Sequence, residues 1–176
     1  MIDGGYAEFT IRRVADQAGM HFRHLQYYFK SKSDLLRVLI ESVCESYIQQ
    51  CDTLLADVHS GPRERFLACI EFLIEDNREP ASNTLFFELW ALACHDEHVN
   101  RALDRLYTYY RTYISRLIGE MKPQLSKEDI ARRAVQIVAL IEGLTLFIGR
   151  NKPQHAATRG LGQDVRDTIL RMVQAD

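Results

Sequence analysis

The chain has 176 residues, and 47% of them are hydrophobic, which is enough for a buried core in one domain or in a small module joined to a larger one. Four prolines and nine glycines are too few for a disordered or fibrous protein. The formal net charge of −2 excludes a uniformly basic nucleic-acid-binding protein.

Helical periodicity dominates the chain, and no stretch alternates strictly enough to predict a β-strand. Thr10 is the expected N-cap of the first helix and Gly19 its end, while Ser33 is the expected N-cap of the third. Residues 151–162 form an expected polar loop. The predicted helices cover about residues 11–18, 22–29, 34–58, 62–77, 82–94, 96–121, 126–150 and 163–174. This pattern predicts an all-α protein.

Charge is distributed unevenly along the chain. Residues 9–33 contain five cationic side chains and one acid, a local net charge of +4, so the remainder carries −6. Such asymmetry indicates a basic surface for an anionic partner on a mildly acidic body.

The basic segment contains two short predicted helices joined by a tight turn at Gly19, the arrangement of a helix-turn-helix. In that motif the second helix enters the major groove. Arg23 suits a bidentate contact with guanine, and Phe22 suits a thymine methyl group. An ordinary helical hairpin with a basic solvated face explains the charge equally well.

Several fixed positions over residues 10–36 resemble the N-terminal signature of TetR-type transcription regulators. They are Thr10-Ile11, Val14-Ala15, Ala18-Gly19, Leu25, Tyr28-Phe29, Ser31-Lys32 and Leu35-Leu36. The resemblance implies a repressor that binds operator DNA as a homodimer and responds to a small-molecule effector. It implies a DNA-binding helix-turn-helix at residues 1–33 and a helical bundle for ligand binding and dimerisation at 34–176.

The resemblance also assigns residues to the DNA contact. It makes Phe22, Arg23 and His24 base-facing. It makes the following residues mostly phosphate-facing: Thr10, Gln26, Tyr27, Tyr28 and Lys32.

The segment departs from the family pattern in two ways. His21 stands where the family usually has a capping Ser or Thr, so the second helix is expected to lack its usual N-cap; Arg23 and Gln26 also replace common residues. In addition, a full helix usually precedes the segment that here begins at Gly5. Either this sequence is truncated or the protein lacks this first helix. In both cases Tyr6, Phe9 and Leu25 are expected to have fewer partners, and the DNA-binding unit is expected to be mobile.

Residues 62–121 are rich in aromatic side chains, which in helices usually form core. The alternative is an apolar cavity with a few polar groups that orient a ligand, which the family resemblance favours. The candidate ligand-binding residues are Phe66, Ile70, Phe87, Trp90, Tyr110 and Leu144.

The helix at 126–150 is apolar on nearly all sides from Ala134 to Ile148, which requires burial all round. It is predicted to form a four-helix dimer interface with the last helix and their symmetry mates, although a central helix within one monomer is the alternative. The candidate interface residues are Ile137, Ile141, Gly143, Val165, Ile169, Met172 and Val173.

No catalytic constellation and no cofactor motif is present, so an enzyme is not expected. His95 and His98 flank two acids, but no further cluster completes a metal site, and a solvated turn is the simpler interpretation. The four cysteines are interpreted as small buried hydrophobic residues in a reducing compartment.

The first ten residues hold no apolar run typical of a secretory leader, and the longest apolar stretch is shorter than the roughly 20 residues that a membrane span needs. A cytoplasmic, ligand-responsive DNA-binding repressor is therefore the leading hypothesis. The alternative is a dimeric helical small-molecule-binding protein with impaired DNA binding.

Overall fold

A computed structural model describes residues 4–56, 61–149, 152–153 and 155–174. These residues form helices and connecting turns without any β-strand, which confirms the all-α prediction. Two 3₁₀ turns, η1 (Tyr6–Glu8) and η2 (Ala156–Thr158), accompany the α-helices. The helices are α1 (Ile11–Gln17), α2 (Phe22–Tyr28), α3 (Lys32–Ala56), α4 (Pro62–Asp76), α5 (Pro80–Ala93), α6 (Glu97–Met121), α7 (Lys127–Ile148) and α8 (Leu161–Gln174). The predicted ends at residues 58 and 150 lie outside the described residues.

Local capping explains where most helices begin and end. Thr10 Oγ1 accepts a hydrogen bond from the Arg13 amide at 3.1 Å, as predicted. Gly19 ends α1 with a φ of 63°, and the Met20 and Gly19 amides donate to the Ala15 and Asp16 carbonyls in a Schellman arrangement. These two predictions needed only local sequence, and both are confirmed.

Three predicted helix starts are two residues late. Ser31, rather than Ser33, caps α3: its hydroxyl accepts from the Asp34 amide at 3.1 Å, and the Asp34 carboxylate accepts from the Ser31 amide at 3.2 Å. Pro80 occupies the first turn of α5 instead of separating two helices. Similarly, α8 begins at Leu161 rather than at residue 163.

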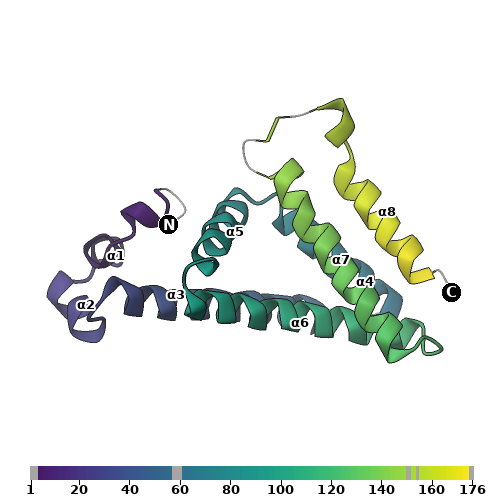
Figure 1. The fold of residues 1–176 in the computed structure, drawn as a ribbon, viewed down its shortest axis with the longest axis horizontal. Helices are drawn as coiled ribbons and strands as arrows, with labels where there is room; N and C mark the ends of the chain where they lie inside the picture. The colour runs from purple at the N-terminus through teal and green to yellow at the C-terminus, as the bar shows by residue number, and fades with distance from the viewer. Residues whose placement is uncertain (1–3, 57–60, 150–151, 154, 175–176) are drawn as a thin grey trace.

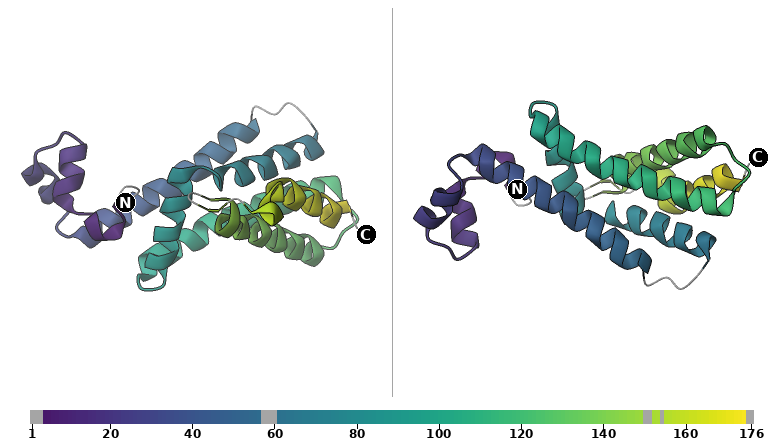
Figure 2. Two further views of the ribbon diagram at one scale, coloured as in Figure 1. Left: turned by 90° about the horizontal axis from the view of Figure 1, so that it is seen from above. Right: turned by 90° about the horizontal axis from the view of Figure 1, so that it is seen from below.

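The short helices α1 and α2 form a unit at one end of the molecule, and α3 leads from it into the helical body, where it runs beside α6 (Figures 1 and 2). α5 stands between this unit and the packed helices α4, α7 and α8 (Figure 1). The C-terminal helix α8 lies on the far side of the body from α1 and α2 (Figure 1). The body therefore separates a projecting N-terminal unit from a distal helical pair.

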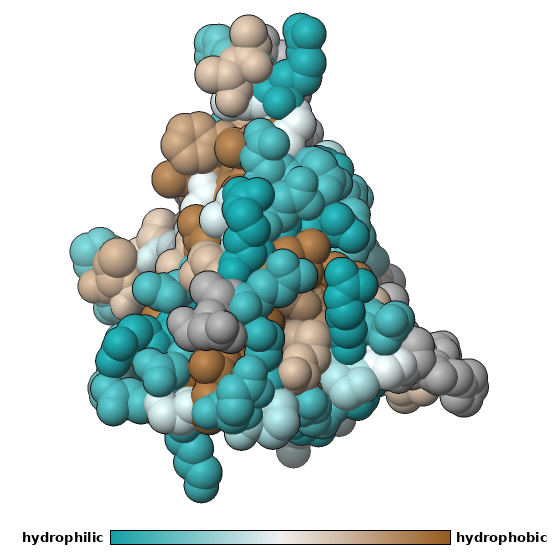
Figure 3. Space-filling model, turned by 90° about the vertical axis from the view of Figure 1, so that its right-hand side faces the viewer, coloured by the Kyte–Doolittle hydropathy of each residue, from teal (hydrophilic) through white to brown (hydrophobic). Residues whose placement is uncertain are grey.

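The pair α7 and α8 retains apolar surface. Leu146 and Phe147 of α7 are 56% and 51% exposed, and Val135 is 49% exposed. The face on the side of α8 shows apolar side chains in patches between polar ones (Figure 3). The single chain therefore leaves part of α7 uncovered, and the prediction that a partner subunit covers it stays a prediction.

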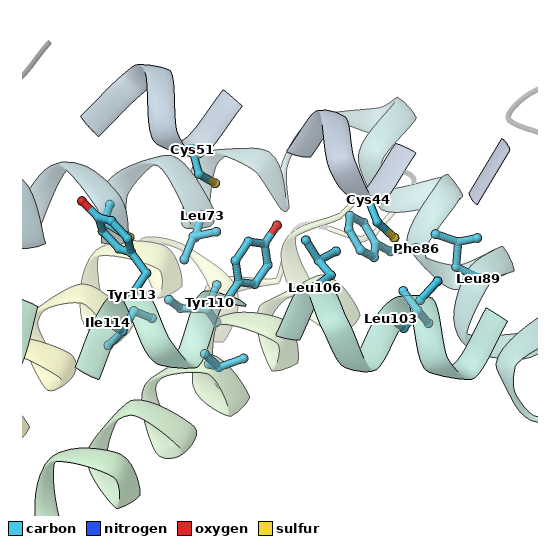
Figure 4. Packing of buried hydrophobic residues seen from close by; sticks show 14 of the residues in the cluster. Cys44, Cys51, Leu73, Phe86, Leu89, Leu103, Leu106, Tyr110, Tyr113 and Ile114 are labelled. Atoms are coloured by element: carbon cyan, nitrogen blue, oxygen red, sulfur yellow. The ribbon is translucent and has the colours of Figure 1, made fainter. Parts of the chain in front are cut away.

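The core lies where α6 meets α3, α4, α5 and α7. Leu106 and Tyr110 of α6 point toward the layer that holds Cys44 and Cys51 of α3 (Figure 4). Burial raises the pKa of the Cys51 and Cys69 thiols to about 12, so both stay protonated. Cys94 is exposed, however, which corrects the prediction that all four cysteines are buried.

Candidate DNA-binding surface and inner cavity

The N-terminal unit is held together by a small apolar centre. Ala15 of α1 and Leu25 of α2 are buried, as is Phe9 before α1. The expected loss of partners for Phe9 and Leu25 is therefore not observed. The left-handed turn at Gly19 sets the angle between the two helices, which leaves the outer face of α2 directed away from the body (Figure 1).

The outer face of α2 carries the predicted base-reading and phosphate-binding side chains. Arg23, His24 and Gln26 are exposed. Tyr27 and Tyr28 are each 71% exposed, and their rings meet edge to face with centroids 5.4 Å apart. Exposed tyrosine hydroxyls of this kind can hydrogen-bond to phosphate oxygens of a DNA backbone.

The first turn of α2 is capped in an unexpected way. The His21 Nδ1 atom accepts a hydrogen bond from the Arg23 amide at 3.3 Å. The expectation that α2 lacks an N-cap is therefore wrong, because an imidazole nitrogen replaces the usual hydroxyl. Only the tautomer that leaves Nδ1 unprotonated can serve as this acceptor.

Three further residues predicted to contact DNA interact with other groups of the same chain. Phe22 is half-buried, with the Arg12 guanidinium 5.7 Å from its ring centroid. Thr10 caps α1 and remains exposed. Lys32 differs most, because its ammonium donates to the Tyr6 carbonyl at 2.9 Å and lies 3.7 Å from the Tyr6 ring centroid.

A polar cavity lies inside the body between α4, α5, α6 and α7. Its volume is about 20 Å³, the space of one water molecule. Two of its lining residues are aromatic and most of the others are polar. The lining comprises Leu73, Asp76, Asn77, Ser82, Asn83, Phe86, Tyr110, Glu142 and Thr145.

Hydrogen bonds tie the polar lining into two groups. The Ser82 hydroxyl donates to Asp76 Oδ1 at 2.8 Å, and the Tyr47 hydroxyl donates to Ser82 Oγ at 2.6 Å. On the other side, the Thr145 hydroxyl donates to the Asn77 side-chain oxygen. These bonds satisfy polar groups that would otherwise destabilise the interior.

Glu142 is the second acid of the cavity. Its carboxylate accepts a hydrogen bond from the Tyr107 hydroxyl at 3.3 Å, and Tyr107 accepts one from the Trp90 indole at 2.8 Å. Burial raises the pKa of Glu142 to about 7, a shift that the Tyr107 hydrogen bond opposes and the nearby Asp76 reinforces.

Asp76 and Glu142 both have a raised pKa and no partner of opposite charge among the described residues. Burial also raises the pKa of Asp76, against the effect of its hydrogen bonds from Ser82 and Tyr47. Within the described part of the chain, neither acid forms an ion pair with Lys, Arg or His. The cavity therefore holds two acids that no Lys, Arg or His among the described residues balances.

The predicted ligand-binding residues do not form one site. Tyr110 lines the inner cavity, and Trp90 reaches it through Tyr107. Phe87 is half-buried and packs edge to face on Trp90, with the Lys152 ammonium 5.1 Å from its ring centroid.

The remaining predicted ligand residues belong elsewhere. Ile70 and Leu144 are buried in the core and line neither the inner cavity nor the distal one. Phe66 lines a different, distal cavity of about 330 Å³ between the ends of α4, α6 and α8. Sequence reasoning missed Asp76 and Glu142, although the interruption of an apolar helix by Glu142 was visible.

The predicted dimer residues also divide into two sets. Ile137, Ile141, Ile169 and Val173 are buried inside the protomer, because α7 and α8 pack on each other and on the body. The protomer alone already covers these four side chains, so they would contribute little surface to the predicted dimer interface. The half-buried set comprises Gly143, Val165 and Met172.

The acidic turn before α6 has a structural role. The Asp96 carboxylate caps the helix by accepting from the His98 and Val99 amides at 2.8 and 3.3 Å. Among the described residues, no group of three His, Cys, Asp or Glu side chains is arranged to hold a metal ion. The same residues include no helix long and apolar enough to cross a membrane.

Glu142 makes stability depend on pH. Its ordinary pKa of 4.5 rises to about 7 in the fold, so the native state retains a proton that the unfolded chain loses first. The free energy of unfolding should therefore fall as pH rises from 4.5 through 7, with Asp76 acting in the same direction. The Glu142→Gln variant lacks this titrating group. We therefore expect the free energy of unfolding of the variant, relative to that of the unmodified protein, to rise by about 3 kcal/mol between pH 4.5 and pH 8.

Urea unfolding at the two pH values measures this gain. Glu45→Gln, which alters an exposed acid of α3, is the matched control. An equal difference between Glu142→Gln and the unmodified protein at both pH values would contradict the prediction.

Known sequence families match both parts of the chain. Residues 1–39 match the family described as bacterial regulatory proteins, tetR family. Residues 62–174 match the family described as BetI-type transcriptional repressor, C-terminal.

Individual relatives agree with the family matches. An HTH-type transcriptional regulator in the dhlA 5′ region of Xanthobacter autotrophicus is 31% identical over 144 residues, which cover 78% of this chain and 68% of the relative. The HTH-type transcriptional regulator BetI of Cronobacter sakazakii is 27% identical over 146 residues, which cover 82% of this chain and 71% of that protein.

Solved structures share the fold. A TetR transcription regulator from Haloarcula marismortui superposes with a TM-score of 0.76 at 19% identity, covering 98% of this chain and 89% of that one. A regulator from Saccharomonospora viridis, solved in complex with choline, has a TM-score of 0.72 at 18% identity, with 96% and 88% covered.

Proposed function

The chain belongs to the TetR family and is a DNA-binding transcriptional regulator, and from this premise we propose that it represses transcription as a homodimer controlled by a small organic cation. The site of action is the cytoplasm, where the operator is accessible. The observation that carries the effector class is the pair of acids, Asp76 and Glu142, without a balancing cation among the described residues.

The DNA-binding part of the proposal rests on the outer face of α2. Its exposed Arg23, His24 and Gln26 offer hydrogen-bonding groups that suit base edges, and the exposed Tyr27 and Tyr28 suit phosphates. A symmetric dimer would present two such helices to successive major grooves, about 34 Å apart on one face of the duplex.

The effector proposal rests on charge and on aromatic rings. An organic cation in the inner cavity would supply the positive charge that the two acids lack. Phe86 and Tyr110 line the same cavity, and aromatic faces attract quaternary ammonium groups. The S. viridis regulator of the same fold was solved with choline, a quaternary ammonium compound, which makes choline the natural first probe.

The inner cavity is so small that effector binding requires a change in protein conformation. A volume of about 20 Å³ holds one water but not a choline molecule. A ligand of that size must therefore select a state in which the lining helices α4, α5, α6 and α7 have moved apart. A ligand that binds one conformation better than another shifts the population toward it, which is the physical basis of the proposed control of DNA binding.

The dimer proposal uses residues other than those predicted. Val135, Leu146 and Phe147 leave apolar surface on α7, and Val165 and Met172 of α8 are only half-buried. Packing α7 and α8 against a symmetric copy would bury this surface in a four-helix interface.

We expect Phe147→Glu to raise the dissociation constant of the dimer by about 30-fold or more, because it introduces a charge into an apolar contact. Analytical ultracentrifugation over a range of protein concentrations measures the effect. Val38→Glu is the control, because Val38 is an exposed apolar residue of α3, a helix that packs mainly on α6 and α4. A Phe147→Glu variant as dimeric as the control would refute the proposed interface.

Operator binding with and without choline tests the whole proposal. DNA fragments that flank the gene are incubated with the protein at low salt and resolved by electrophoretic shift. A specific shift that choline changes supports the proposal. Choline binding without any DNA shift would instead leave a dimeric ligand-binding protein with impaired DNA binding.

A further inference from the structure

Tyr6, in the turn before α1, is held from two sides. Its backbone amide donates a hydrogen bond to Glu88 Oε2 of α5 at 3.0 Å. Its carbonyl accepts one from the Lys32 ammonium, in the first turn of α3, at 2.9 Å. The same ammonium lies 3.7 Å from the centroid of the Tyr6 ring, in cation–π geometry. Tyr6 therefore joins the body, through Glu88, to the start of the connecting helix.

Gly5 allows this close approach. Its φ of 64° lies in the left-handed region, and a Cβ atom at this position would lie 3.0 Å from Glu88 Oε1. The backbone thus reaches the Glu88 carboxylate at a point where a larger residue would disturb it. Carboxylate-to-amide hydrogen bonds are stronger than neutral ones, and this one is partly shielded from solvent.

The helix that supplies Glu88 also forms a wall of the inner cavity. Ser82, Asn83 and Phe86 of α5 line that cavity, and Glu88 follows two residues after Phe86. A helix moves largely as one body, so a displacement of α5 at the cavity also displaces Glu88. In Figure 1, α5 stands between the N-terminal unit and the helices behind it.

We propose that Glu88 is a positioning residue for DNA binding, which fixes the α1–α2 unit to α5 through the Tyr6 amide. This inference rests on the proposed function, because it assumes that α2 binds an operator. In the DNA-binding state the contact restrains the unit, which reduces the ordering that binding requires. When α5 moves, the contact transmits the displacement to the unit.

The test compares Glu88→Ala with Glu88→Gln. The alanine variant removes the acceptor, whereas the glutamine variant keeps an oxygen that can accept from the Tyr6 amide. Glu45→Ala, at an exposed acid of α3, is the matched control. The readouts are hydrogen exchange of the Tyr6 amide by NMR, operator affinity and thermal unfolding. Glu88 is not among the cavity-lining residues, so choline binding is measured as a check that the cavity is intact.

We expect Glu88→Ala to accelerate exchange of the Tyr6 amide and to weaken operator binding, each by about 10-fold, with unfolding and choline binding retained. Glu88→Gln should restore operator affinity to within about 2-fold of the unmodified protein, because the hydrogen bond is kept. A purely structural role for Glu88 would lower the unfolding temperature instead, without rescue of DNA binding.

Two results would overturn the inference. One is unchanged Tyr6 exchange in Glu88→Ala; the other is faster exchange with full operator affinity. Failure of the proposed function looks different, because the unmodified protein would then give no operator shift at all.

Discussion

Replacing Glu142 with glutamine is expected to weaken choline binding by about 100-fold, the effect of removing one partner of a charge pair in a largely desolvated site. Glu142 supplies a carboxylate at a cavity where no cation of the described residues balances it. The glutamine keeps the shape and can still accept the Tyr107 hydrogen bond. The loss therefore measures the attraction between the carboxylate and the ligand rather than a disturbance of the fold.

Calorimetric titration with choline measures this effect, at a pH of 8 where Glu142 is ionised. Glu120→Gln is the matched control, because Glu120 borders the distal cavity and not the inner one. Equal choline affinities for Glu142→Gln and the unmodified protein, with a loss in Glu120→Gln, would move the effector site to the distal cavity. Affinity should also fall below pH 7 as Glu142 becomes protonated.

Replacing Arg23 with alanine is expected to weaken specific operator binding by about 10-fold or more and to relax sequence preference at one base pair. Arg23 is exposed at the start of α2, and its guanidinium forms no ion pair within the described residues. It is thus available for a bidentate contact with guanine. Binding to unrelated DNA should change less, because that binding rests on phosphate contacts.

Electrophoretic shift with the operator and with scrambled DNA, each over a range of salt concentrations, separates the two contributions. Arg171→Ala is the control, since Arg171 is an exposed arginine of α8, at the other end of the molecule. Equal losses on operator and scrambled DNA would assign Arg23 to the phosphate backbone instead of to a base.

Local rules predicted the DNA-binding unit well, because its determinants are neighbours in sequence. Thr10 caps α1 and Gly19 ends it through contacts that span at most five residues. The start of α3 was harder, since Ser31 and Ser33 both precede an apolar run. Asp34 decides between them by bonding back to Ser31, three residues earlier.

The inner cavity could not be predicted in the same way. Tyr110 was predicted as a ligand-binding residue, but the surroundings of Glu142 arise from contacts between distant helices. The Tyr107 hydroxyl of α6 donates to the Glu142 carboxylate, and the Trp90 indole of α5 donates to Tyr107. In the sequence, Glu142 only interrupts an apolar run. The nature of the cavity depends on contacts between helices that are far apart along the chain.

The predicted dimer interface shows a second limit of prediction from sequence periodicity. The spacing of Ile169 and Val173 correctly indicates a buried face of α8, but the partner that buries this face is α7 of the same protomer. A periodic pattern shows which side of a helix is covered and not which molecule covers it. The exposed Leu146 and Phe147 became visible only once that internal packing was known.

The small volume of the inner cavity affects how much effector is needed for a response. If the competent, expanded state is a small fraction of the population, the apparent dissociation constant exceeds the intrinsic one by the inverse of that fraction. The proposed effector would then act only after it has accumulated, and trace amounts would leave transcription unchanged. A substitution that enlarges the cavity would lower this threshold, so under the proposed function the packing around Asp76 and Glu142 would set the concentration at which a cell responds.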